Sequence, residues 1–398
     1  MASYSKRVRK NKDKKDTIYW IGQTNENGVR KSFYGKTKKE VEAKVNEYLS
    51  DLYTYGSPLS NESVILSKWI YSFLFSTAIH NLSPSTFDRY KGIYDNYLEC
   101  SSIGALNVKE ITPLQLQQFF NEQMHLSHAS LKKIYFLLNQ SFKAAIKNSL
   151  IRMNPLDGVV VPNKHIEPKE VQILTKDQQR DYIVHAENEL YGLLCITTLF
   201  TGMRLGEITA LRWENVDLEN GIIYVKESVK ISKVYNSDGS FQKEHVTKKP
   251  KSKSSIREIP IPPFLIDKLL LHRPLKPSNI LAQHYVFETS KGNHILDSNV
   301  RRTHHKICAA AKINPIKVVK AGKIQIKYKG VSFHALRHTF ASRMIESGES
   351  IKVVQELLGH KDVQTTLNIY THVLSDTLKA TADKQQALFQ ELFQMEIS

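Results

Sequence analysis

The chain has 398 residues, which suggests two or three domains, and 41% of them are hydrophobic, which excludes an intrinsically disordered protein. A formal net charge of +17 fits a polyanionic partner, with nucleic acid favoured over an anionic membrane surface. No apolar run approaches the roughly 20 residues of a membrane span, no signal peptide is evident, and three scattered cysteines match neither a disulfide framework nor a zinc motif and fit a reducing cytosol.

A small basic unit is predicted for residues 1–55, where 13 Lys and Arg residues outnumber 7 Asp and Glu residues. The charged run "SKRVRKNKDKK" precedes "TIYWIGQ" and "NENGVRKSFYG", which read as two strands around a turn at Asn27-Gly28. A helix follows from Thr37, which forms a capping box with Glu40. A basic hairpin backed by a helix could lie in a DNA groove, and a solvated basic surface is the alternative.

A helical block is predicted for residues 64–155. It lies between a linker at 55–63, which is rich in Gly, Pro, Ser and Asn, and a linker at 154–170, where three prolines break the helical pattern. Ser83-Pro84 and Thr112-Pro113 each place a capping residue before a proline that suits a first helical turn. Two apolar stripes at helical spacing are predicted to form core without chemistry. They are Phe87, Tyr90, Ile93, Tyr94, Tyr97 and Leu98, and Leu131, Ile134, Leu138, Phe142 and Ile146.

The pattern becomes mixed from residue 172. Thr175 and Gln178 start a helix, "ELYGLLCITTLF" is a buried helix, and the chain turns at Gly202 before another helix begins. "NGIIYVKESVKIS" and "SSIREIPI" read as strands, and a polar, lysine-rich segment at 235–254 separates them.

The remainder is predicted to be helical apart from one hairpin. Residues 316–328 alternate apolar residues and lysines around Ala321-Gly322, which suggests a hairpin with one cationic face. "HALRH" opens a helix that runs to about Glu346, where Gly348 acts as the C-cap.

That last helix begins with His334, Arg337 and His338, which share one face because they are three and four residues apart. A metal site is the first interpretation, but the stretch lacks the glutamate of HExxH and a nearby third ligand, and Arg337 would oppose a cation. Structural core histidines are the second interpretation. A phosphate site explains more, because arginine forks match phosphate oxygens and imidazoles near neutral pKa donate to phosphate or move a proton.

Tyr370 completes this interpretation, because a tyrosine can attack phosphorus and hold a covalent intermediate. Metal-free transfer of this kind requires a second arginine and a lysine elsewhere, since the transition state carries extra negative charge. "TGMRLGEITALRW", "HALRHTFAS" and "LGHKDVQTTLNIYTHV" supply that pattern and resemble the tyrosine recombinases, or phage-type integrases, over residues 172–375. The three-domain integrases of temperate phages and conjugative transposons are the most similar in layout.

The resemblance implies a multidomain α+β chain. Residues 1–55 would be a β-sheet-plus-helix arm-type DNA-binding domain, residues 64–160 an all-α core-binding domain, and residues 172–398 a mixed, mainly α catalytic domain with a C-terminal tail. Leu388, Phe389, Leu392 and Phe393 give that tail an apolar face, which would dock on the next protomer or pack on its own domain.

The resemblance also assigns the phosphate-binding arginines and the lysine. Arg204 would be the first arginine, and Glu207 would orient its helix. The family's lysine stands at a turn before a strand of the form S-x-R-x-I-P. Here Lys251 fits best, and Lys253, Lys248 and Lys249 stay open.

The remaining family positions follow the same order. His334 would be the first active-site histidine, Arg337 the second arginine, His360 a further donor and Tyr370 the nucleophile, while His338 would be structural. Arg204, Arg337 and His360 would neutralise the phosphate oxygens, Lys251 would protonate the leaving 5′-oxygen, and His334 would help to deprotonate Tyr370. No metal or other cofactor is implied.

The partners implied are double-stranded DNA at core and arm sites, a homo-tetramer in the synapse, an excisionase and a host DNA-bending protein, all in the bacterial cytoplasm and away from membranes. The activity implied is integration and excision of a mobile element through a 3′-phosphotyrosyl link. A type IB topoisomerase with the same chemistry and a catalytically silent DNA-binding regulator are the alternatives.

Overall fold

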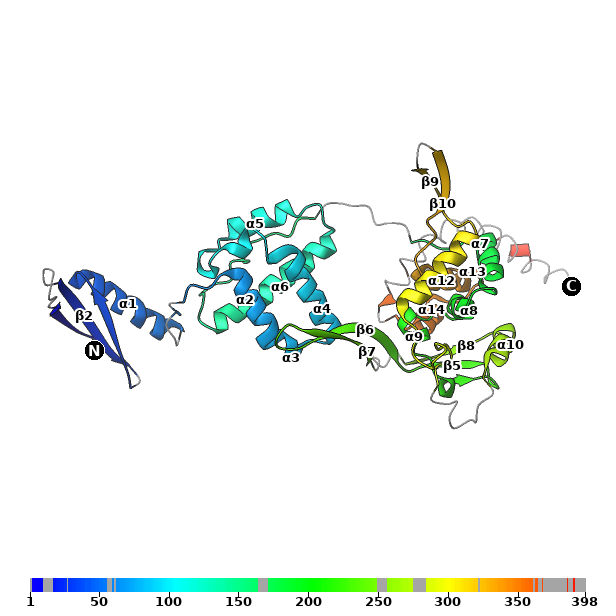
Figure 1. The fold of residues 1–398 in the computed structure, drawn as a ribbon, viewed down its shortest axis with the longest axis horizontal. Coiled ribbons are helices and arrows are strands. Elements are labelled where there is room, and N and C mark those ends of the chain that lie inside the picture. The colour runs from blue at the N-terminus through cyan, green and yellow to red at the C-terminus, as the bar shows by residue number, and fades with distance from the viewer. Residues whose placement is uncertain are drawn as a thin grey trace. The chain divides into compact units, whose positions relative to one another are not determined.

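The computed structural model describes residues 2–9, 17–26, 28–55, 59–60, 62–163, 171–248, 256–274, 284–320 and 323–360, with positions 362, 363, 367, 385, 389 and 390 beyond them. Two compact units make up the chain. The N-terminal unit holds residues 1–166 and 233–242, and the C-terminal unit holds residues 167–232 and 243–398. Figure 1 labels their helices and strands. No helix among the described residues is long and apolar enough to cross a membrane.

The N-terminal unit begins with an antiparallel sheet of β1 (Ser3–Arg9), β2 (Thr17–Glu26) and β3 (Val29–Gly35), followed by α1 (Lys38–Tyr55). Gly28 has a φ of 80°, as the predicted turn requires. The two predicted strands and the helix are confirmed, whereas β1 lies in the run that was expected to be only charged. Its residues pair with β2 throughout, and it contains Tyr4 and Val8, residue types that favour strands.

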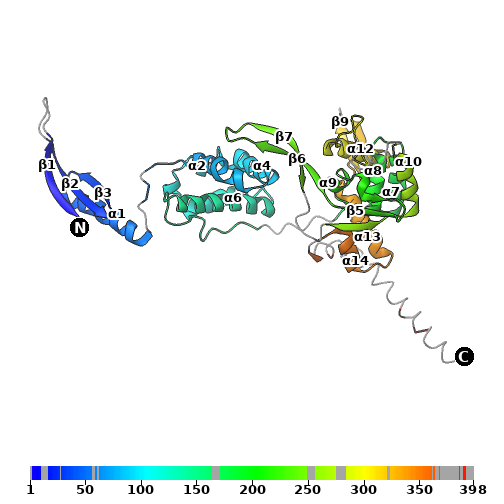
Figure 2. The same cartoon turned by 90° about the horizontal axis from the view of Figure 1, so that it is seen from below.

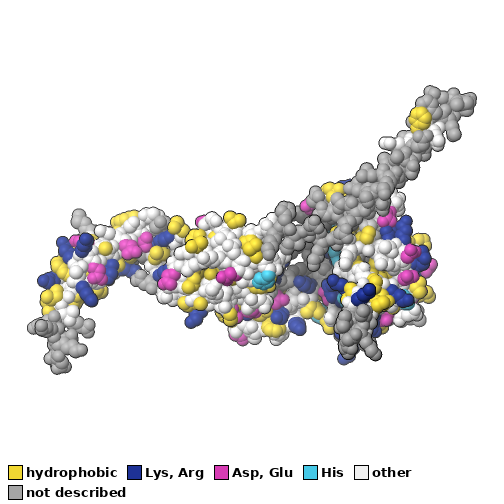
Figure 3. Space-filling model, turned by 90° about the horizontal axis from the view of Figure 1, so that it is seen from above, with side chains coloured by type: hydrophobic (Ala, Val, Ile, Leu, Met, Phe, Trp, Pro, Cys, Tyr) yellow, Lys and Arg dark blue, Asp and Glu magenta, His cyan; other side chains and the backbone are white. Residues whose placement is uncertain are grey.

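The start of α1 keeps half of its predicted capping box. The Thr37 hydroxyl accepts a hydrogen bond from the Glu40 backbone N–H at 3.2 Å. The Glu40 carboxylate instead accepts from the backbone N–H of Lys36 at 2.8 Å. Figure 3 shows Lys and Arg side chains on the face of this sheet-and-helix segment, mixed with Asp and Glu.

The predicted helical block is confirmed. It contains α2 (Leu66–Phe73), α4 (Pro84–Ile93), α5 (Pro113–Glu122) and α6 (His128–Lys147), with π-helical turns at Leu74–Ala78 and Tyr94–Leu98 and a short α3 (Ile79–Asn81). Thr112 and Gln115 form a full capping box at α5. Most residues of both predicted stripes lie in the buried core, and only Tyr97 and Ile146 are partly exposed.

The C-terminal unit surrounds the buried helix α8 (Gly192–Thr201), as predicted. Helices α7 (Lys176–Ala186), α12 (Asp297–Ala310) and α13 (His334–Glu346) pack against α8. A small antiparallel sheet joins β4 (Val216–Asp217), β5 (Ile222–Val225) and β8 (Arg257–Pro260). Helices α9 (Leu205–Ile208), α10 (Pro263–His272) and α14 (Ile351–Leu358) complete the described part of this unit.

The segment between β5 and β8 differs from its prediction. "NGIIYVKESVKIS" is not one strand, because β5 and β6 (Ser228–Tyr235) belong to different sheets. The segment expected to be polar and irregular contains β7 (Phe241–Lys248), which pairs with β6 in a hairpin. Residues 241–245 are all exposed, so β7 carries no alternation of apolar and polar residues by which it could be recognised.

The lysine-rich hairpin is present as β9 (Pro315–Lys320) and β10 (Lys323–Tyr328), while Ala321-Gly322 lies outside the described residues. Its predicted cationic face does not include Lys317. Lys317 is opposite Ile326, so Lys317 and Lys327 project to opposite faces because successive strand residues alternate.

We predict that Gly202→Ala destabilises the C-terminal unit by about 1–3 kcal/mol. Gly202 ends α8 with a φ of 62°, and a Cβ there would lie 2.6 Å from Phe340 Cδ1 and 2.8 Å from Leu358 Cδ2. Gly92→Ala is the matched control, because Gly92 lies in α4 with no atom within 4 Å of an added Cβ, and alanine favours a helix. Calorimetry of the full chain would show this, and equal shifts for the two variants would contradict it.

Candidate active site

The structure brings four of the six predicted site residues into the C-terminal unit's described part. Arg204 precedes α9, His334 and Arg337 lie on the first turn of α13, and His360 follows α14. Lys251 and Tyr370 lie outside the described residues, as do the alternatives Lys249 and Lys253. Lys248 ends β7, but its side chain is not described.

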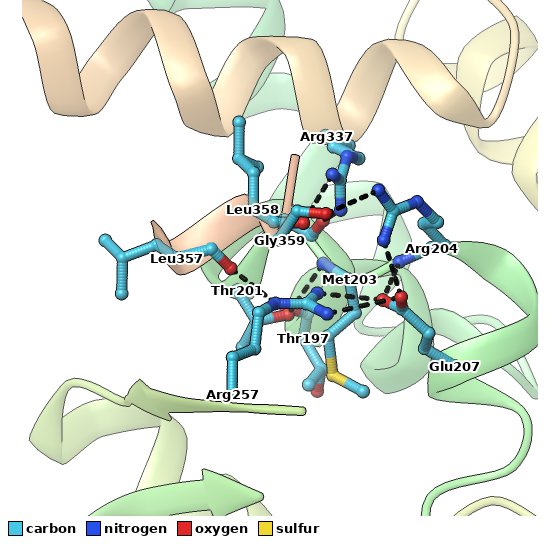
Figure 4. Close-up of polar contacts among 11 residues, drawn as sticks. Thr197, Thr201, Met203, Arg204, Glu207, Arg257, Arg337, Leu357, Leu358 and Gly359 are labelled. Atoms are coloured by element: carbon cyan, nitrogen blue, oxygen red, sulfur yellow. Dashed lines mark hydrogen bonds and ion pairs between the residues drawn. The ribbon is translucent and has the colours of Figure 1, made fainter. Parts of the chain in front are cut away.

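The C-terminus of α14 is the centre of the arrangement, and three arginines converge on it (Figure 4). Ser350 caps the start of this helix, and Gly359 ends it in the left-handed conformation with a φ of 64°. The last carbonyls of a helix lack intrahelical partners and carry partial negative charge. Arginine side chains therefore stabilise this helix end in place of solvent.

Each arginine takes a different carbonyl. Arg257 Nε donates to the Leu357 oxygen at 2.6 Å, and Arg337 Nη2 donates to the Leu358 oxygen at 2.6 Å. Arg204 Nη2 donates to the Gly359 oxygen at 3.1 Å. The three guanidinium groups come from segments far apart in sequence, and the fold brings them together at the end of α14.

Glu207 joins two of these arginines. Its carboxylate accepts from Arg204 Nη1 at 2.8 Å and from Arg257 Nη1 and Nη2 at 3.2 and 2.8 Å. It also accepts from the Arg204 backbone N–H at 2.8 Å, which fixes the start of α9. Burial alone would raise the pKa of Glu207, but hydrogen bonds and charge from Arg257, and the charge of Arg204, lower that pKa to about 2.

The charges at this point do not balance. Among the residues that the hydrogen bonds above join at the end of α14, three guanidinium groups face the carboxylate of Glu207, which leaves an excess of two positive charges within this described set. Arg337 is only 1% exposed and also donates Nη1 to the Gly202 oxygen at 2.6 Å. Burial, and then the charge of Arg204, lower the pKa of Arg337 to about 9. A buried surplus of positive charge favours an anionic ligand.

Two further observations on Arg337 and Arg204 bear on such a ligand. The Nε of Arg337 is buried and has no hydrogen-bond partner in the part of the chain that the structure describes. The side chain of Arg204 is 38% exposed, so its guanidinium group can be reached from outside.

Three histidines adjoin the arginines. Removal from water is the main cause that lowers the pKa of His338 to about 4 and that of His360 to about 3, and the charge of Arg337 adds to both. Partial removal from water also lowers the pKa of His334, followed by the charges of Arg337 and Arg204. The His334 and His338 rings lie edge to face with centroids 4.6 Å apart. At neutral pH these rings are therefore uncharged and donate hydrogen bonds rather than charge.

This environment also bears on the metal interpretation. Within the described ranges, no group of three His, Cys, Asp or Glu side chains could hold a metal ion. The histidines instead lie among guanidinium groups, which disfavour a second cation.

A groove of about 730 Å³ runs between β8 and α14, with Arg257, Leu357 and His360 among its lining residues. The two candidate residues outside the described part of the chain are close in sequence to residues that line this groove. Lys251 is five residues before Ile256, a reach of up to about 18 Å, and Tyr370 is ten residues after His360, a reach of about 15–35 Å. Both are therefore joined to this groove by a short length of chain.

Arg257 is the residue that sequence reasoning missed as part of the site. Its strand alternates buried and exposed positions, and Arg257 takes a buried one. A charged residue at an inward position of a strand predicts a buried partner, so the signal was present in "SSIREIPI". The partner Glu207 is 50 residues away in the chain and could not be identified from spacing.

Comparisons with known proteins match most of the chain. The profile described as the phage integrase family matches residues 164–376, and the profile described as a phage integrase N-terminal SAM-like domain matches residues 65–124. A protein named tyrosine recombinase XerC-like from Caldanaerobacter subterraneus subsp. tengcongensis is 33% identical over 392 residues, covering 94% of this chain and 96% of that protein. The ICEBs1 integrase of Bacillus subtilis is 25% identical, covering 88% and 89%.

Solved structures share the fold at low identity. The Tn1549 transposon integrase in complex with a circular intermediate DNA has a TM-score of 0.57 and 19% identity, and the match covers 79% of this chain and 99% of that one. The lambda integrase tetramer bound to a Holliday junction has a TM-score of 0.52 and 17% identity, with 88% and 92% covered.

We predict that Arg257→Gln destabilises the C-terminal unit by about 3 kcal/mol, because it leaves a buried carboxylate without its bidentate partner. Adding Glu207→Gln should recover part of the loss, so the double mutant should be less destabilised than the sum of the single variants by about 0.5–3 kcal/mol. Arg180→Gln, which breaks an exposed pair with Asp177, should leave stability essentially unchanged. Denaturant unfolding measures all four, and strict additivity would refute the coupling.

We also predict that acid destabilises the C-terminal unit through its histidines. In the folded chain the pKa values of His338 and His360 lie below the ordinary value of 6.5, so the unfolded chain binds protons first. Their contribution is complete above about pH 6.5 and is lost as pH falls toward about 4 and then 3. Thermal unfolding between about pH 7.5 and pH 5 should show a falling midpoint, with a shallower slope in His338→Gln. A midpoint independent of pH would contradict this.

Proposed function

The chain belongs to the phage integrase family, and from this premise we propose that it breaks and rejoins DNA by transferring a scissile phosphate to Tyr370. Membership of a family of tyrosine recombinases makes it a site-specific recombinase. The assignment of roles to individual residues is our proposal.

The surplus of two positive charges at the end of α14 is the observation that carries these roles. A phosphodiester has one negative charge, and its five-coordinate transition state acquires a second. Arg204 and Arg337 match that charge without a metal ion, and each guanidinium can turn N–H groups toward the non-bridging oxygens. His360, whose pKa is about 3, donates as a neutral imidazole.

The sequence of bond changes is balanced. The Tyr370 oxygen attacks phosphorus, its proton passes toward His334, and the bond from phosphorus to the 5′-oxygen breaks. Lys251 protonates the leaving 5′-oxygen. A 5′-hydroxyl from the partner strand later attacks the 3′-phosphotyrosine, so the phosphoester bond energy is retained and no nucleotide cofactor is consumed.

Glu207 and Arg257 do not contact the phosphate in this proposal and instead position the residues that do. Glu207 holds the guanidinium of Arg204, and Arg257 neutralises Glu207 while holding the Leu357 carbonyl. Both are therefore positioning residues. His338 supports the ring of His334 through their edge-to-face contact.

The assignment of domains follows the same family layout. We propose that residues 1–55 bind arm-type DNA, that residues 64–160 bind the core site, and that residues 172–398 carry the chemistry. The SAM-like profile supports the second assignment, and the solved relative assembled as a tetramer supports a homo-tetramer. An excisionase, a host DNA-bending protein and action on DNA in the bacterial cytoplasm complete the proposal.

Two smaller assignments concern surfaces beyond the site. We propose that the β9–β10 hairpin contacts DNA backbone with the exposed lysines Lys317 and Lys327 from its two faces, rather than from one. We also propose that the tail, whose Leu388, Leu392 and Phe393 lie outside the described residues, docks on the next protomer.

The alternatives are less well supported. The named relatives are recombinases and integrases, which argues against a type IB topoisomerase. A silent DNA-binding regulator would not require the buried charge surplus at α14, which costs folding stability and is justified by an anionic ligand.

We predict that Tyr370→Phe binds target DNA with unchanged affinity and forms no covalent adduct with a nicked half-site substrate. The phenyl ring keeps the packing but lacks the attacking oxygen. Denaturing gel electrophoresis measures the adduct, and a mobility shift measures binding. Phe264→Tyr, at an exposed position of α10, is a control that should form the adduct normally. An adduct that persists in Tyr370→Phe would refute the assignment.

A further inference from the structure

The tip of the β6–β7 hairpin belongs to the N-terminal unit, although β6 begins and β7 ends in the C-terminal unit. Residues 233–242 are grouped with residues 1–166, whereas 228–232 and 243–248 are not. Figures 1 and 2 both show this tip beside α4. The chain therefore enters the N-terminal unit a second time, at a point that neither predicted linker accounts for.

Aromatic rings hold the tip in place. The ring of Tyr235 packs against the rings of Phe87 and Phe75, with centroid distances of 5.2 and 6.3 Å. Phe75 and Phe87 are 7% and 2% exposed and belong to the core of the helical block, so the tip extends that core. Phe241 covers the other side of Tyr235 at 5.4 Å. Contacts of this kind between aromatic rings are favourable beyond the area that they bury.

Polar contacts fix the orientation of the same tyrosine. The Tyr235 hydroxyl donates to Asp88 Oδ1 at 3.1 Å, and Lys233 Nζ lies 3.9 Å from that oxygen. Burial, followed by the hydrogen bond to Asp88, raises the pKa of Tyr235 to about 12. The ring is thus anchored at both its apolar face and its hydroxyl.

Hydrogen bonds and a glycine fix the conformation of the turn that follows this tyrosine. The Asn236 backbone N–H donates to the Ser240 oxygen at 2.8 Å, and Asp238 accepts from the Ser240 N–H at 2.8 Å. Gly239 has a φ of 87°, and a Cβ there would lie 2.8 Å from the Tyr71 hydroxyl oxygen. A side chain at position 239 would therefore disturb both the turn and its approach to the helical block.

We propose that this tip is an intramolecular docking element, which seats on the Phe75–Phe87–Asp88 surface and anchors the strand that leads to Lys251. β7 ends at Lys248, three residues before Lys251. Anchoring β7 on the block that binds the core site would couple engagement of that block to placement of the general acid. The coupling rests on the proposed function, whereas the docking does not.

Photo-crosslinking tests the docking in the full chain. Tyr235→p-benzoylphenylalanine should crosslink to a peptide within residues 71–94, and the product should have the mass of one chain. Gln242→p-benzoylphenylalanine is the control, because Gln242 is exposed on the same hairpin. Crosslinks from position 235 to another region, or only between two chains, would overturn the proposal.

Cleavage of two half-site substrates tests the coupling. In a 5′-bridging phosphorothiolate, sulfur replaces the leaving 5′-oxygen. The sulfur departs as a thiolate and needs no proton, so cleavage of this substrate does not depend on a general acid. Tyr235→Ala should slow cleavage of the ordinary phosphate by about tenfold or more and should cut the sulfur substrate at nearly the wild-type rate. Gln242→Ala should match the wild type on both.

Lys251→Ala separates the two ways in which this test can fail. If the sulfur substrate does not rescue Lys251→Ala, the proposed role of Lys251 is wrong and the coupling falls with it, while the crosslink still decides the docking. If it rescues Lys251→Ala but not Tyr235→Ala, or if Tyr235→Ala cuts the phosphate at the wild-type rate, the coupling is overturned.

Discussion

The bidentate contact between Glu207 and Arg257, buried at the end of α14, is the interaction on which the rest of the site depends. It neutralises the carboxylate that also holds Arg204, and the same arginine holds the Leu357 carbonyl. Removing any one member leaves a buried charge or a carbonyl without a partner. The network therefore ties β8, α9 and α14 into one body before any phosphate arrives, as preorganised catalysis requires.

The charge surplus and the uncharged histidines both result from the burial of this network. Removal from water, together with the charges of neighbouring guanidinium groups, depresses the pKa values of Arg337, His338 and His360. The free site thus stores electrostatic repulsion, which the phosphate that we propose as its ligand would relieve. Binding and stability are linked for this reason, because a ligand that binds only the folded state adds its binding free energy to folding.

Much of this was accessible from the sequence, because the signals were local. Capping boxes at Thr112 and Thr175, the left-handed turn at Gly28 and the start of α13 at His334 are each set by a few adjacent residues. Contacts distant in sequence were not accessible. Arg257 reaches Leu357 across 100 residues, and β7, exposed along residues 241–245, is defined by its partner β6 rather than by its own pattern. The resemblance to tyrosine recombinases supplied Arg204 and Arg337 by motif, but it gave neither their carbonyl partners at the end of α14 nor the hairpin tip.

The claim that arginines rather than a metal carry the phosphate charge is tested most directly by removing that charge from the DNA. The measurement is the cleavage rate of half-sites that carry either a phosphate or a neutral methylphosphonate at the scissile position, for the wild type and Arg204→Ala, in the presence of a metal chelator. The account predicts that Arg204→Ala costs about 10²–10³ in rate on the phosphate and far less on the methylphosphonate. An equal loss on both substrates, or a loss of wild-type cleavage on chelation, would contradict it.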